Sequence, residues 1–590
     1  MDCAISVTGL GIMCAIGNDA QSVLDSLRAG KSGIRAMKYL RSKHSELPVG
    51  EVQMSNEEMK ALLGLDAGKT VSRTSLMGAI CVRQALEQAG ITGIEGKRVV
   101  LISGTTVGDM DVTEKYFSRM LTDDSLLHLP HSNECGTSSL EIASMAGLGD
   151  ARVCTISTAC SSALNSIIVG AGMLRRDEAD IVVAGGAEAL SRFHLNGFNT
   201  LMILDKRQCR PFDRDRAGLN LGEGAAFVVL EKNAPDSLAY VSGYGNRCDA
   251  FHQTASSENG EGAYLAMTEA LAMAGLKCGE IQYVNAHGTG TQNNDRSESH
   301  ALKRVFAGAL PEISSTKGFT GHTTSASGAI ETVICILSML NGFTPANYGW
   351  NASEEGGIVP TMGSKDVVLD NVMCNSFGFG GNDSSIILTR NRQYGTGTGP
   401  QCRSTDCDGI IVAAEELVSS RDELPALKEF IPPMESRRMG KLMKAAMLAS
   451  LRALKKAGLA MPDAIVTATS RGMLETSQQF MMELEANDEE QLKPTLFMQS
   501  THNTVGSAIA IHTGCHGYNI TYSQGDESEE WAMLDAGRLI TRKDIASVLV
   551  CSFDESTPIF DSLSERSGEP VPDGLKARSI ILVRKDGQIT

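Results

Sequence analysis

The sequence predicts an α/β protein made of two globular units. Residues 1–393 alternate apolar, β-branched runs with segments of helical period, the pattern of strands and helices that share a core. Of the 590 residues, 42% are hydrophobic and 21% are charged, which is enough apolar material for more than one core. A Gly- and Thr-rich stretch at 394–408 has no apolar period, so we interpret it as a linker to a second unit at 409–590.

Strands of the first unit are predicted where β-branched apolar runs end in small residues. The chain begins with such a run, MDCAISVTGLGIMCAIG, which lacks the basic segment of a signal peptide. Further strands are predicted within RVVLISGTTVG at 98–108 and ADIVVAGGAEAL at 179–190. The helical period of SLMGAICVRQALEQAG predicts a helix that ends at Gly90, because glycine favours the left-handed conformation of a helix C-cap.

The second unit repeats this order of elements. GIIVAAEEL, DAIVTATSRG, VLVCSF and SIILVR are predicted strands, and MGKLMKAAMLASLRALKKAG is a predicted helix. The segments ALEQAGI, LISGTTVGDMD and VGAGMLRRDEADIVV of the first unit resemble ALKKAGL, IVTATSRGMLE and LDAGRLITRKDIASV of the second, in the same order. We therefore interpret residues 409–590 as a degenerate copy of the first half of the first unit.

Composition excludes several classes of function. A net charge of −17 argues against a nucleic-acid partner, since phosphate binding requires a basic surface. No stretch reaches the roughly 20 apolar residues of a membrane span, and the nearest, 161–174, carries Asn165 and Ser166. The fifteen cysteines show no CxxC pairs, which favours reduced thiols. We expect a cytoplasmic protein without membrane contact.

Cys160 is the first candidate for chemistry. In ARVCTISTACSSALNS it lies between a predicted strand and a predicted helix, where the helix dipole and unpaired N–H groups favour a thiolate. A buried structural cysteine is the competing interpretation.

Two histidines strengthen the catalytic interpretation. His287 in VNAHGTGTQ and His322 in STKGFTGH each follow strand-like residues and lie beside Gly and Thr, so loops are expected to present them. Together with Cys160 they can form a Cys-His-His site that stabilises a thioester oxyanion. Zinc binding is less consistent with the sequence, because the three residues lack the paired spacing of zinc ligands. The Gly-rich loop FGFGG is either a simple turn or a backbone N–H donor to the site, and it does not match a dinucleotide fingerprint.

Four segments together resemble the elongating β-ketoacyl-acyl carrier protein synthases: TACSS, HGTGT, the K-x-x-x-GH loop and NSFGFGG. VTGLG and RPFDRDRAGLNLGEGAAFVVLE extend the match over nearly all of the first unit. The resemblance implies a thiolase fold with two similar halves, residues 1–235 and 236–393, in α-β-α-β-α layers. It also implies a dimer, and it makes residues 409–590 a half-thiolase-like α/β unit.

The same resemblance assigns roles. It implies that Cys160 accepts an acyl group from a carrier-protein or coenzyme A thioester. His287 and His322 then bind the carbonyl of a malonyl thioester and stabilise the enolate formed as carbon dioxide leaves. The implied activity is decarboxylative Claisen condensation, which elongates a fatty acid or polyene chain.

Three supporting residues follow from the family pattern. The backbone N–H groups of Cys160 and Phe379 are expected to form the oxyanion hole, and Phe379 to gate the acyl tunnel. Lys317 and Glu298 are expected to pair and to hold the histidine loops. No metal and no cofactor is implied.

Neighbouring families fit the residues less well. Initiating synthases have Asn in place of one histidine, and thiolases use a second Cys as a base. Cys374 is the nearest second Cys, but elongating synthases also tolerate Cys before NSFGFGG, so we interpret it as structural. GGND at 380–383 departs from the commoner GGTN, which affects fine substrate contacts and not the chemistry.

The second unit is expected to lack catalysis. Aligned with the first unit, the position of Cys160 falls at Gly525, next to Gln524, and no HGTGT or GFGG loop follows. The unit resembles the truncated ketosynthase-like proteins of aryl polyene and flexirubin-type pathways and, loosely, chain-length factors. We expect it to shape a pocket and to dock on the first unit as a pseudo-partner.

Acyl carrier proteins are the expected partners, together with a second copy or another ketosynthase-like subunit as a homodimer or heterodimer. Because carrier proteins are acidic, basic residues near the tunnel mouth are candidates for docking. These are Lys69, Arg73, Lys206 and Arg207. The alternative function is a non-elongating specificity or scaffold subunit for a separate synthase.

Overall fold

The computed structural model describes residues 4–127, 129, 134–391, 409–542, 544–571 and 574–585. The linker predicted at 394–408 lies outside these residues. Within them, one continuous sheet of 15 strands runs through the molecule, and β9 (Phe343–Thr344) and β10 (Lys365–Asp366) form a small separate pair. The 15 strands divide into three groups of five that share one strand order.

The first group belongs to the N-terminal half of the first unit. Its strands are β1 (Ile5–Cys14), β2 (Val99–Gly104), β3 (Arg152–Ile156), β4 (Ile181–Glu188) and β5 (Gly224–Lys232). They lie in the order β3-β2-β4-β5-β1. Both strands expected at 98–108 and 179–190 are confirmed as β2 and β4, and both are buried along their whole length.

The second group belongs to the C-terminal half of the same unit. Its strands are β6 (Ala239–Cys248), β7 (Tyr283–Asn285), β8 (Glu312–Ser314), β11 (Asn371–Gly378) and β12 (Asn382–Thr389). Read outward from β6 the order is β6-β12-β11-β7-β8, which repeats the first group strand for strand, and β6 joins it through an antiparallel pairing with β1. The first unit therefore has the two similar halves that the sequence predicts.

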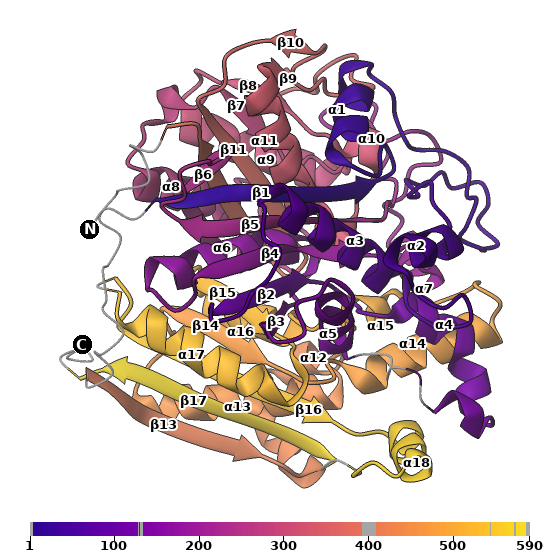
Figure 1. Ribbon diagram of the computed structural model, residues 1–590. Coiled ribbons are helices and arrows are strands. Elements are labelled where there is room, and N and C mark those ends of the chain that lie inside the picture. The colour runs from indigo at the N-terminus through magenta and orange to yellow at the C-terminus, as the bar shows by residue number, and fades with distance from the viewer. Residues whose placement is uncertain are drawn as a thin grey trace.

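The third group is the second unit. Its strands are β13 (Ile410–Val418), β14 (Ala464–Ala468), β15 (Tyr518–Tyr522), β16 (Ser547–Glu555) and β17 (Leu575–Arg584). The order β13-β17-β16-β14-β15 again matches β1-β5-β4-β2-β3. β15 runs antiparallel to β3, with Tyr522 opposite Ile156, so the second unit extends the sheet of the first. Figure 1 shows this unit, in orange and yellow, below the N-terminal half.

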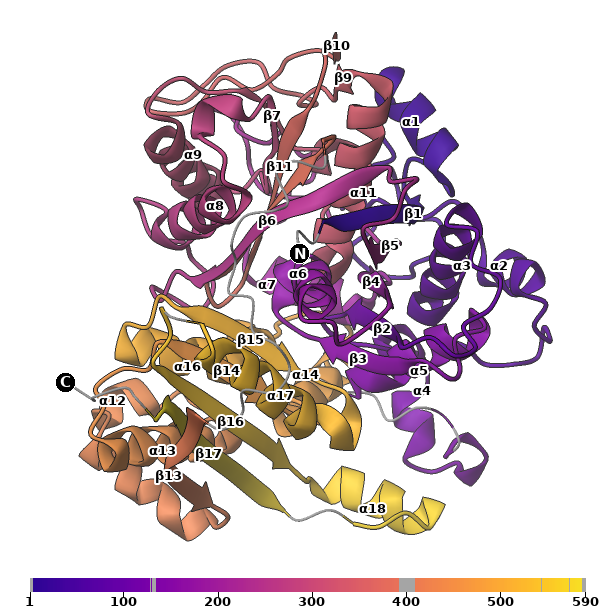
Figure 2. The same ribbon diagram turned by 60° about the vertical axis from the view of Figure 1, so that its left-hand side comes forward.

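Helices fill the layers between and outside the sheets. α3 (Arg73–Gln88) covers β1 and β5, α8 (Glu261–Ala274) covers β6 and β12, and α6 (Ser162–Arg175) and α11 (Ser327–Asn341) pack against each other. The largest core cluster contains α6, α11 and strands of all three groups, so these two helices form the central layer (Figure 2). The layers are α-β-α-β-α, as predicted.

The remaining helices surround this framework. They are α1 (Ala20–Arg28), α2 (Asn56–Leu63), α4 (Met110–Met120), α5 (Cys135–Met145), α7 (Arg192–Thr200), α9 (Gln292–Phe306), α10 (Lys317–Thr320), α12 (Pro433–Ser436), α13 (Lys441–Ala457), α14 (Leu474–Ala486), α15 (Pro494–Met498), α16 (Thr504–Thr513), α17 (Ser528–Ile540), α18 (Pro558–Ser567), and the short 3-10 segments η1 (Asp124–Leu126), η2 (Ala159–Ser161), η3 (Cys278–Glu280), η4 (Thr324–Ala326), η7 (Arg421–Glu429) and η8 (Gly525–Glu527). α7 of the first unit contacts α14 and α15 of the second.

Among the residues that the structure describes, one segment, Thr324–Asn341, is long and apolar enough to cross a membrane by length and composition, and 89% of it is buried inside the protein. It spans η4 and α11. The sequence instead suggested 161–174 as the most apolar run, which is η2 and α6. Both segments belong to the central layer, whose helices are apolar all round because protein covers every side.

Candidate active site

Cys160 lies where β3 ends and α6 begins. It is the middle residue of η2, and Ala159 before it has a left-handed φ of 53° that turns the chain sharply at this point. The side chain is buried, with 5% of its surface exposed. Ser376 of β11 donates a hydrogen bond of 2.9 Å to the Cys160 carbonyl, so the second half holds the turn in place. The thiol therefore sits at the junction of the two halves.

The two predicted histidines reach the same place from the second half. His322 Nε2 lies 3.2 Å from Cys160 Sγ, and His322 Nδ1 lies 3.1 Å from Ser327 Oγ. The His287 ring stands at 83° to the His322 ring, with 5.4 Å between ring centroids. Both histidines are buried. The structure thus brings together the three side chains that the sequence placed on three separate segments.

Burial controls the pKa of the thiol. It raises the pKa of Cys160 to about 12, while the Lys317 charge and the backbone N–H groups of Phe379 and Cys160 act in the opposite direction. The sequence led us to expect a thiolate, because Cys160 opens a helix. Burial acts against the thiolate that this position at the start of a helix favours. Burial thus favours the neutral thiol in the resting site.

The histidines are neutral as well. Burial lowers the pKa of His287 and of His322 well below 6.5, and the Lys317 charge lowers both further. Lys317 Nζ lies 3.3 Å from His287 Nδ1 and can only donate a hydrogen bond. His287 Nδ1 is therefore the acceptor, which leaves the proton on Nε2. Each imidazole is a neutral group able to donate one hydrogen bond.

Lys317 pairs with Glu331 and not with Glu298. Lys317 Nζ lies 2.5 Å from Glu331 Oε1 and donates a second hydrogen bond of 2.6 Å to the His287 carbonyl. Glu298 instead accepts hydrogen bonds of 2.8 Å from the backbone N–H groups of His287 and Gly288. The predicted pair is wrong because Glu298, at the buried face of α9, faces the backbone of the loop. Glu298 holds the His287 loop directly, and Glu331 holds it through Lys317.

Glu331 is the functional residue that the sequence reasoning missed. It is 2% exposed, and burial raises its pKa to about 7, with the Lys317 charge acting against that rise. A signal was present, because Glu331 is the one charged residue in the helix SGAIETVICILSMLN. An isolated charge in a buried helix requires a partner of opposite charge.

The GFGG loop contacts the site and the second unit at once. The half-buried Phe379 ring stacks on Phe198 of α7, with centroids 5.7 Å apart. Asn503 of the second unit donates a hydrogen bond of 2.9 Å to the Phe379 carbonyl. A side chain at Gly380 would collide with Ser507, which lies one turn into α16. The second unit therefore holds the loop that carries Phe379.

The second unit has its own turn at the matching place, with a one-residue difference from the alignment. Gly525 has a left-handed φ of 54°, like Ala159. Ser528 accepts from the Gln524 N–H at 2.8 Å, as Ser162 accepts from the Thr158 N–H at 2.9 Å. Asp526, which is exposed, consequently matches Cys160, and the assignment of that position to Gly525 is wrong. No thiol occupies the matching position.

Two further candidates have structural surroundings. Cys374 lies fully buried in β11, where its side chain contacts Cys335, which agrees with a structural role. Within the described part of the chain, no three His, Cys, Asp or Glu side chains are arranged to hold a metal ion.

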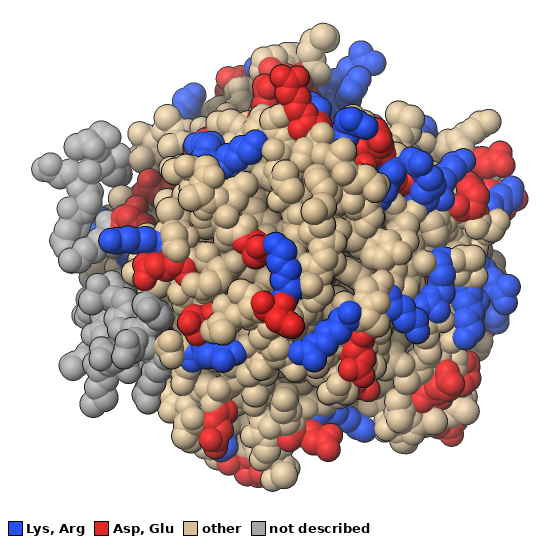
Figure 3. All heavy atoms as spheres, turned by 90° about the horizontal axis from the view of Figure 1, so that it is seen from above, with Lys and Arg blue, Asp and Glu red and all other residues tan. Residues whose placement is uncertain are grey.

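One of the basic docking candidates is wrong. Arg73 is 6% exposed and binds Glu223 through its Nη2 at 2.7 Å, so it is part of the core. Lys69, Lys206 and Arg207 are exposed. Figure 3 shows both signs of charge spread over the upper face, with several basic side chains together at its right-hand edge, the side on which Figure 1 places the loops after α1.

A thiol at a strand-to-helix turn, two neutral imidazoles and five alternating layers together define a condensing enzyme of the thiolase fold. Family models support this class along most of the chain. The model of the β-ketoacyl synthase N-terminal domain matches residues 3–235, and that of the C-terminal domain matches 238–351. Another N-terminal domain model of β-ketoacyl synthases matches 413–576. The chain belongs to the β-ketoacyl synthase family.

Two curated relatives cover the first unit. The 3-oxoacyl-(acyl-carrier-protein) synthase 2 of Vibrio cholerae is 32% identical over 418 residues, which are 65% of this chain and 99% of that protein. Nodulation protein E of Rhizobium meliloti is 31% identical over 414 residues, which are 66% of this chain and 99% of that protein.

Solved structures match one unit or both. The ishigamide ketosynthase/chain length factor gives a TM-score of 0.60 at 28% identity, over 66% of this chain and 100% of the other. The ketosynthase ApeO, solved in complex with its chain length factor ApeC from Xenorhabdus doucetiae, gives 0.56 at 30% identity, over 65% and 98%. The PfaC keto synthase-chain length factor gives 0.79 over 100% of this chain and 79% of the other. At 16% identity, this last match shows the fold alone, second unit included.

Proposed function

We propose that this β-ketoacyl synthase elongates an acyl chain by decarboxylative Claisen condensation on Cys160. The observation that carries the proposal is the placement of Cys160 Sγ 3.2 Å from His322 Nε2, with His287 beside them in the same buried site. The substrates are an acyl thioester and a malonyl thioester of an acyl carrier protein. The product chain is a fatty acid or a polyene, made in the cytoplasm.

In the first step the acyl group moves to Cys160. The Cys160 thiol gives its proton to the departing carrier sulfur, so His322 keeps its own proton on Nε2 for the second step. The sulfur attacks the acyl carbonyl carbon, and the carrier thiol leaves with a proton. The backbone N–H groups of Cys160 and Phe379 act to lower the pKa of the thiol, because both can donate a hydrogen bond to negative charge at the sulfur. The same donors stabilise the tetrahedral oxyanion.

In the second step the malonyl thioester binds with its carbonyl oxygen between the two imidazoles. Each neutral ring donates one hydrogen bond through Nε2, and the bonds strengthen as the carbon–carboxylate bond breaks and an enolate forms. The enolate carbon attacks the acyl group on Cys160. The sulfur leaves as a thiolate that takes up a proton, and the product is a β-ketoacyl thioester two carbons longer.

Lys317 and Glu331 act as positioning residues in this mechanism. Lys317 binds both the carbonyl and Nδ1 of His287, which fixes the ring and its tautomer. Glu331 balances the Lys317 charge in the buried site. Glu298 fixes the backbone of the same loop.

The second unit is a partner built into the chain, which shapes the acyl pocket and has no catalysis of its own. Phe480 of α14 and Phe497 of α15 pack against Phe193 and Phe198 of α7, with ring centroids 5.0 to 5.9 Å apart. Phe198 in turn stacks on Phe379. The similarity to a ketosynthase solved with its chain length factor supports a role of this kind. The complete Cys-His-His set argues against a purely non-elongating scaffold.

Replacement of the nucleophile tests the proposal. We expect Cys160→Ala to abolish elongation and to retain decarboxylation of malonyl-acyl carrier protein, because both histidines remain. Incubation of the unchanged protein with acyl carrier thioesters should leave an acyl adduct on the peptide that contains Cys160, measured by mass spectrometry. Cys374→Ala is the matched control and should keep the adduct. Elongation by Cys160→Ala, or an adduct on another cysteine, would contradict the mechanism.

A further inference from the structure

A polar pocket of about 310 Å³ lies on the N-terminal half, on the outer side of the segment that carries Lys317 and His322. It is formed by the end of β1, the turn before α1, the end of α1 and the loop that follows. Its lining residues are Cys14, Ala15, Ile16, Gly17, Asn18, Ser26, Lys31, Ser32, Arg35 and Gln53. Neither the mechanism nor the second unit uses this pocket.

The charge of the pocket is opposite to that of the protein. Lys31 and Arg35 are its two charged lining residues, and both are positive. Neither forms an ion pair with any acid in the described part of the chain. They belong to the segment 28–43, which contains six Lys and Arg and no Asp or Glu, in a chain of net charge −17. An isolated pair of unbalanced cations in a pocket attracts an anion.

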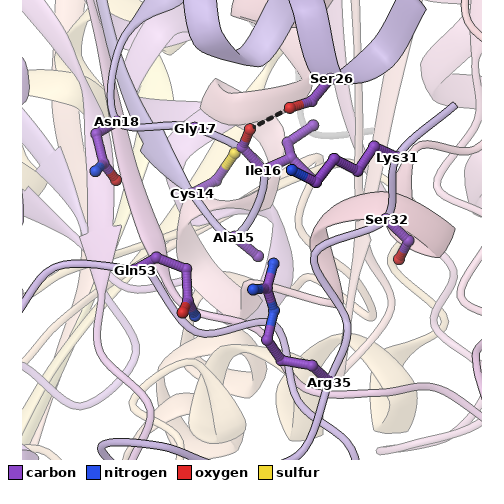
Figure 4. A pocket seen from close by; sticks show the side chains of 10 residues that line it. All are labelled: Cys14, Ala15, Ile16, Gly17, Asn18, Ser26, Lys31, Ser32, Arg35 and Gln53. Atoms are coloured by element: carbon purple, nitrogen blue, oxygen red, sulfur yellow. Dashed lines mark hydrogen bonds between the residues drawn. The ribbon is translucent and has the colours of Figure 1, made fainter. Parts of the chain in front are cut away.

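The hydrogen-bonding groups point to an oxyanion. In Figure 4 the Lys31 ammonium and the Arg35 guanidinium extend into the same space. Arg35 uses Nε to bind the Gly33 carbonyl at 3.1 Å, which leaves both Nη atoms to face the pocket. Ser26 and Ser32 donate their hydroxyl protons to the carbonyls of Ile16 and Gly318. The charged donors that remain match the several acceptors of a phosphate group, which guanidinium and ammonium bind well.

We propose that this pocket binds the phosphate group of a small phosphorylated molecule, with Lys31 and Arg35 as its two charge partners. A doubly charged phosphate balances the two cations. The volume is at the lower end of small-molecule sites, so it accommodates a phosphate and a few further atoms. Free phosphorylated metabolites and the phosphates of coenzyme A share this chemistry.

The pocket is connected by hydrogen bonds to the backbone of the loop 317–322, which presents Lys317 and His322. Ser32 Oγ donates to the Gly318 carbonyl at 2.9 Å, and the Gly33 N–H donates to the Phe319 carbonyl at 2.9 Å. Arg35 and Val49 exchange two backbone hydrogen bonds, and a Cβ at the next residue, Gly50, would lie 2.1 Å from the Thr320 carbonyl, so the chain beside Arg35 also packs tightly on this loop. A ligand that ties Lys31 to Arg35 therefore restrains the loop that presents Lys317 and His322.

Calorimetric titration of the full chain with pyrophosphate tests the site. We expect Lys31→Gln and Arg35→Gln each to weaken binding about tenfold, because each removes a charge-assisted contact, and the double variant to weaken it further. Lys38→Gln is the matched control: it removes a basic residue of the same segment that does not line the pocket. No heat of binding in the unchanged protein, or equal binding by the double variant, would overturn the proposal.

Two added measurements separate the sources and the effect on the loop. If coenzyme A binds more tightly than pyrophosphate and displaces it, the bound phosphate belongs to a thioester carrier. If pyrophosphate binds and coenzyme A does not displace it, the bound phosphate belongs to a free metabolite. In either case the double variant should no longer bind the ligand. Hydrogen exchange of residues 317–322 should slow with pyrophosphate in the unchanged protein and in Lys38→Gln, but not in the double variant. Both readouts are independent of the elongation activity.

Discussion

At the scale of single residues, the site depends on keeping its reactive groups neutral. Cys160, His287 and His322 are all buried, and burial opposes the charged form of each. The one fixed positive charge among them, Lys317, is balanced by Glu331. A neutral imidazole is the appropriate donor to an enolate, because its hydrogen bond strengthens as negative charge develops on the substrate.

This neutrality predicts a flat pH profile for decarboxylation. Since the pKa values of His287 and His322 lie well below 6.5, neither ring gains a proton between about pH 6 and pH 8. The rate of malonyl decarboxylation by Cys160→Ala should therefore be constant over that range, as followed by carbon dioxide release. A fall in rate with a midpoint near 6.5 would show that the rings are solvated and the assignment is wrong.

The Lys317–Glu331 pair predicts a large effect on stability. Glu331→Gln leaves the Lys317 charge buried without a partner, and we expect a loss of about 3–5 kcal/mol in the free energy of unfolding. Urea denaturation measures this loss. Elongation should also fall, because Lys317 orients His287.

The double variant Lys317→Met with Glu331→Met separates the two effects. It removes both charges, so stability should largely return while elongation stays low. Full activity in the double variant would mean that the pair is structural only.

The sequence identified the three reactive residues of the site but not the partner of Lys317. Cys160 was identified because it lies between a predicted strand and a predicted helix. His287 and His322 were identified because each follows strand-like residues and lies beside Gly and Thr. Glu331 was missed, and Glu298 was given its role, because the choice of partner for Lys317 depends on how α9 and α11 lie against one loop. Sequence spacing carries no information on that arrangement.

At the scale of elements, the second unit supports the GFGG loop through the start of α16. Asn503 precedes α16, is 1% exposed and donates its side-chain N–H to the Phe379 carbonyl. We expect Asn503→Ala to slow acylation of Cys160 about fivefold, the effect of one hydrogen bond of about 1 kcal/mol. The rate of adduct formation, followed by mass spectrometry, is the measurement.

Arg566→Ala is the control for this prediction. It removes another contact between the units, the ion pair of Arg566 with Asp124 at 2.6 Å, which does not involve the GFGG loop. Acylation should be unchanged in this variant. Equal slowing in both variants would point to general loosening of the interface.

Element positions followed well from periodicity, whereas single-residue equivalences did not. The predicted strands of the second unit are confirmed as β13, β14, β16 and β17. The position of Cys160 was placed one residue early because the alignment was anchored on the end of α17. The left-handed φ shared by Ala159 and Gly525 is the better anchor, and it is a backbone property that the letters do not display.

At the scale of the whole molecule, the edge of β3 is occupied. β3 pairs with β2 on one side and with β15 on the other, so it offers no free edge to a second copy. We expect the protein to be a monomer of 62.7 kDa by light scattering at micromolar concentration, in place of the dimer expected from the family resemblance. A mass of twice that value would contradict this prediction.

The continuous sheet could not be predicted from the sequence. Local sequence patterns predict the strands and their order along the chain. The pairing of β15 with β3, however, joins segments more than 360 residues apart and rests on a single register position, Tyr522 with Ile156. The likeness of the two units suggested docking. The structure shows that the docking is edge to edge.

The join between β15 and β3 also changes how the protein can evolve. In a twofold dimer of identical chains the interface must be self-complementary, and every substitution appears on both sides. Here the two sides are encoded by separate stretches of one gene. Phe480 and Phe497 can be exchanged for smaller or larger side chains while the surface around Cys160 stays as it is, so new pocket shapes are open to selection one side at a time.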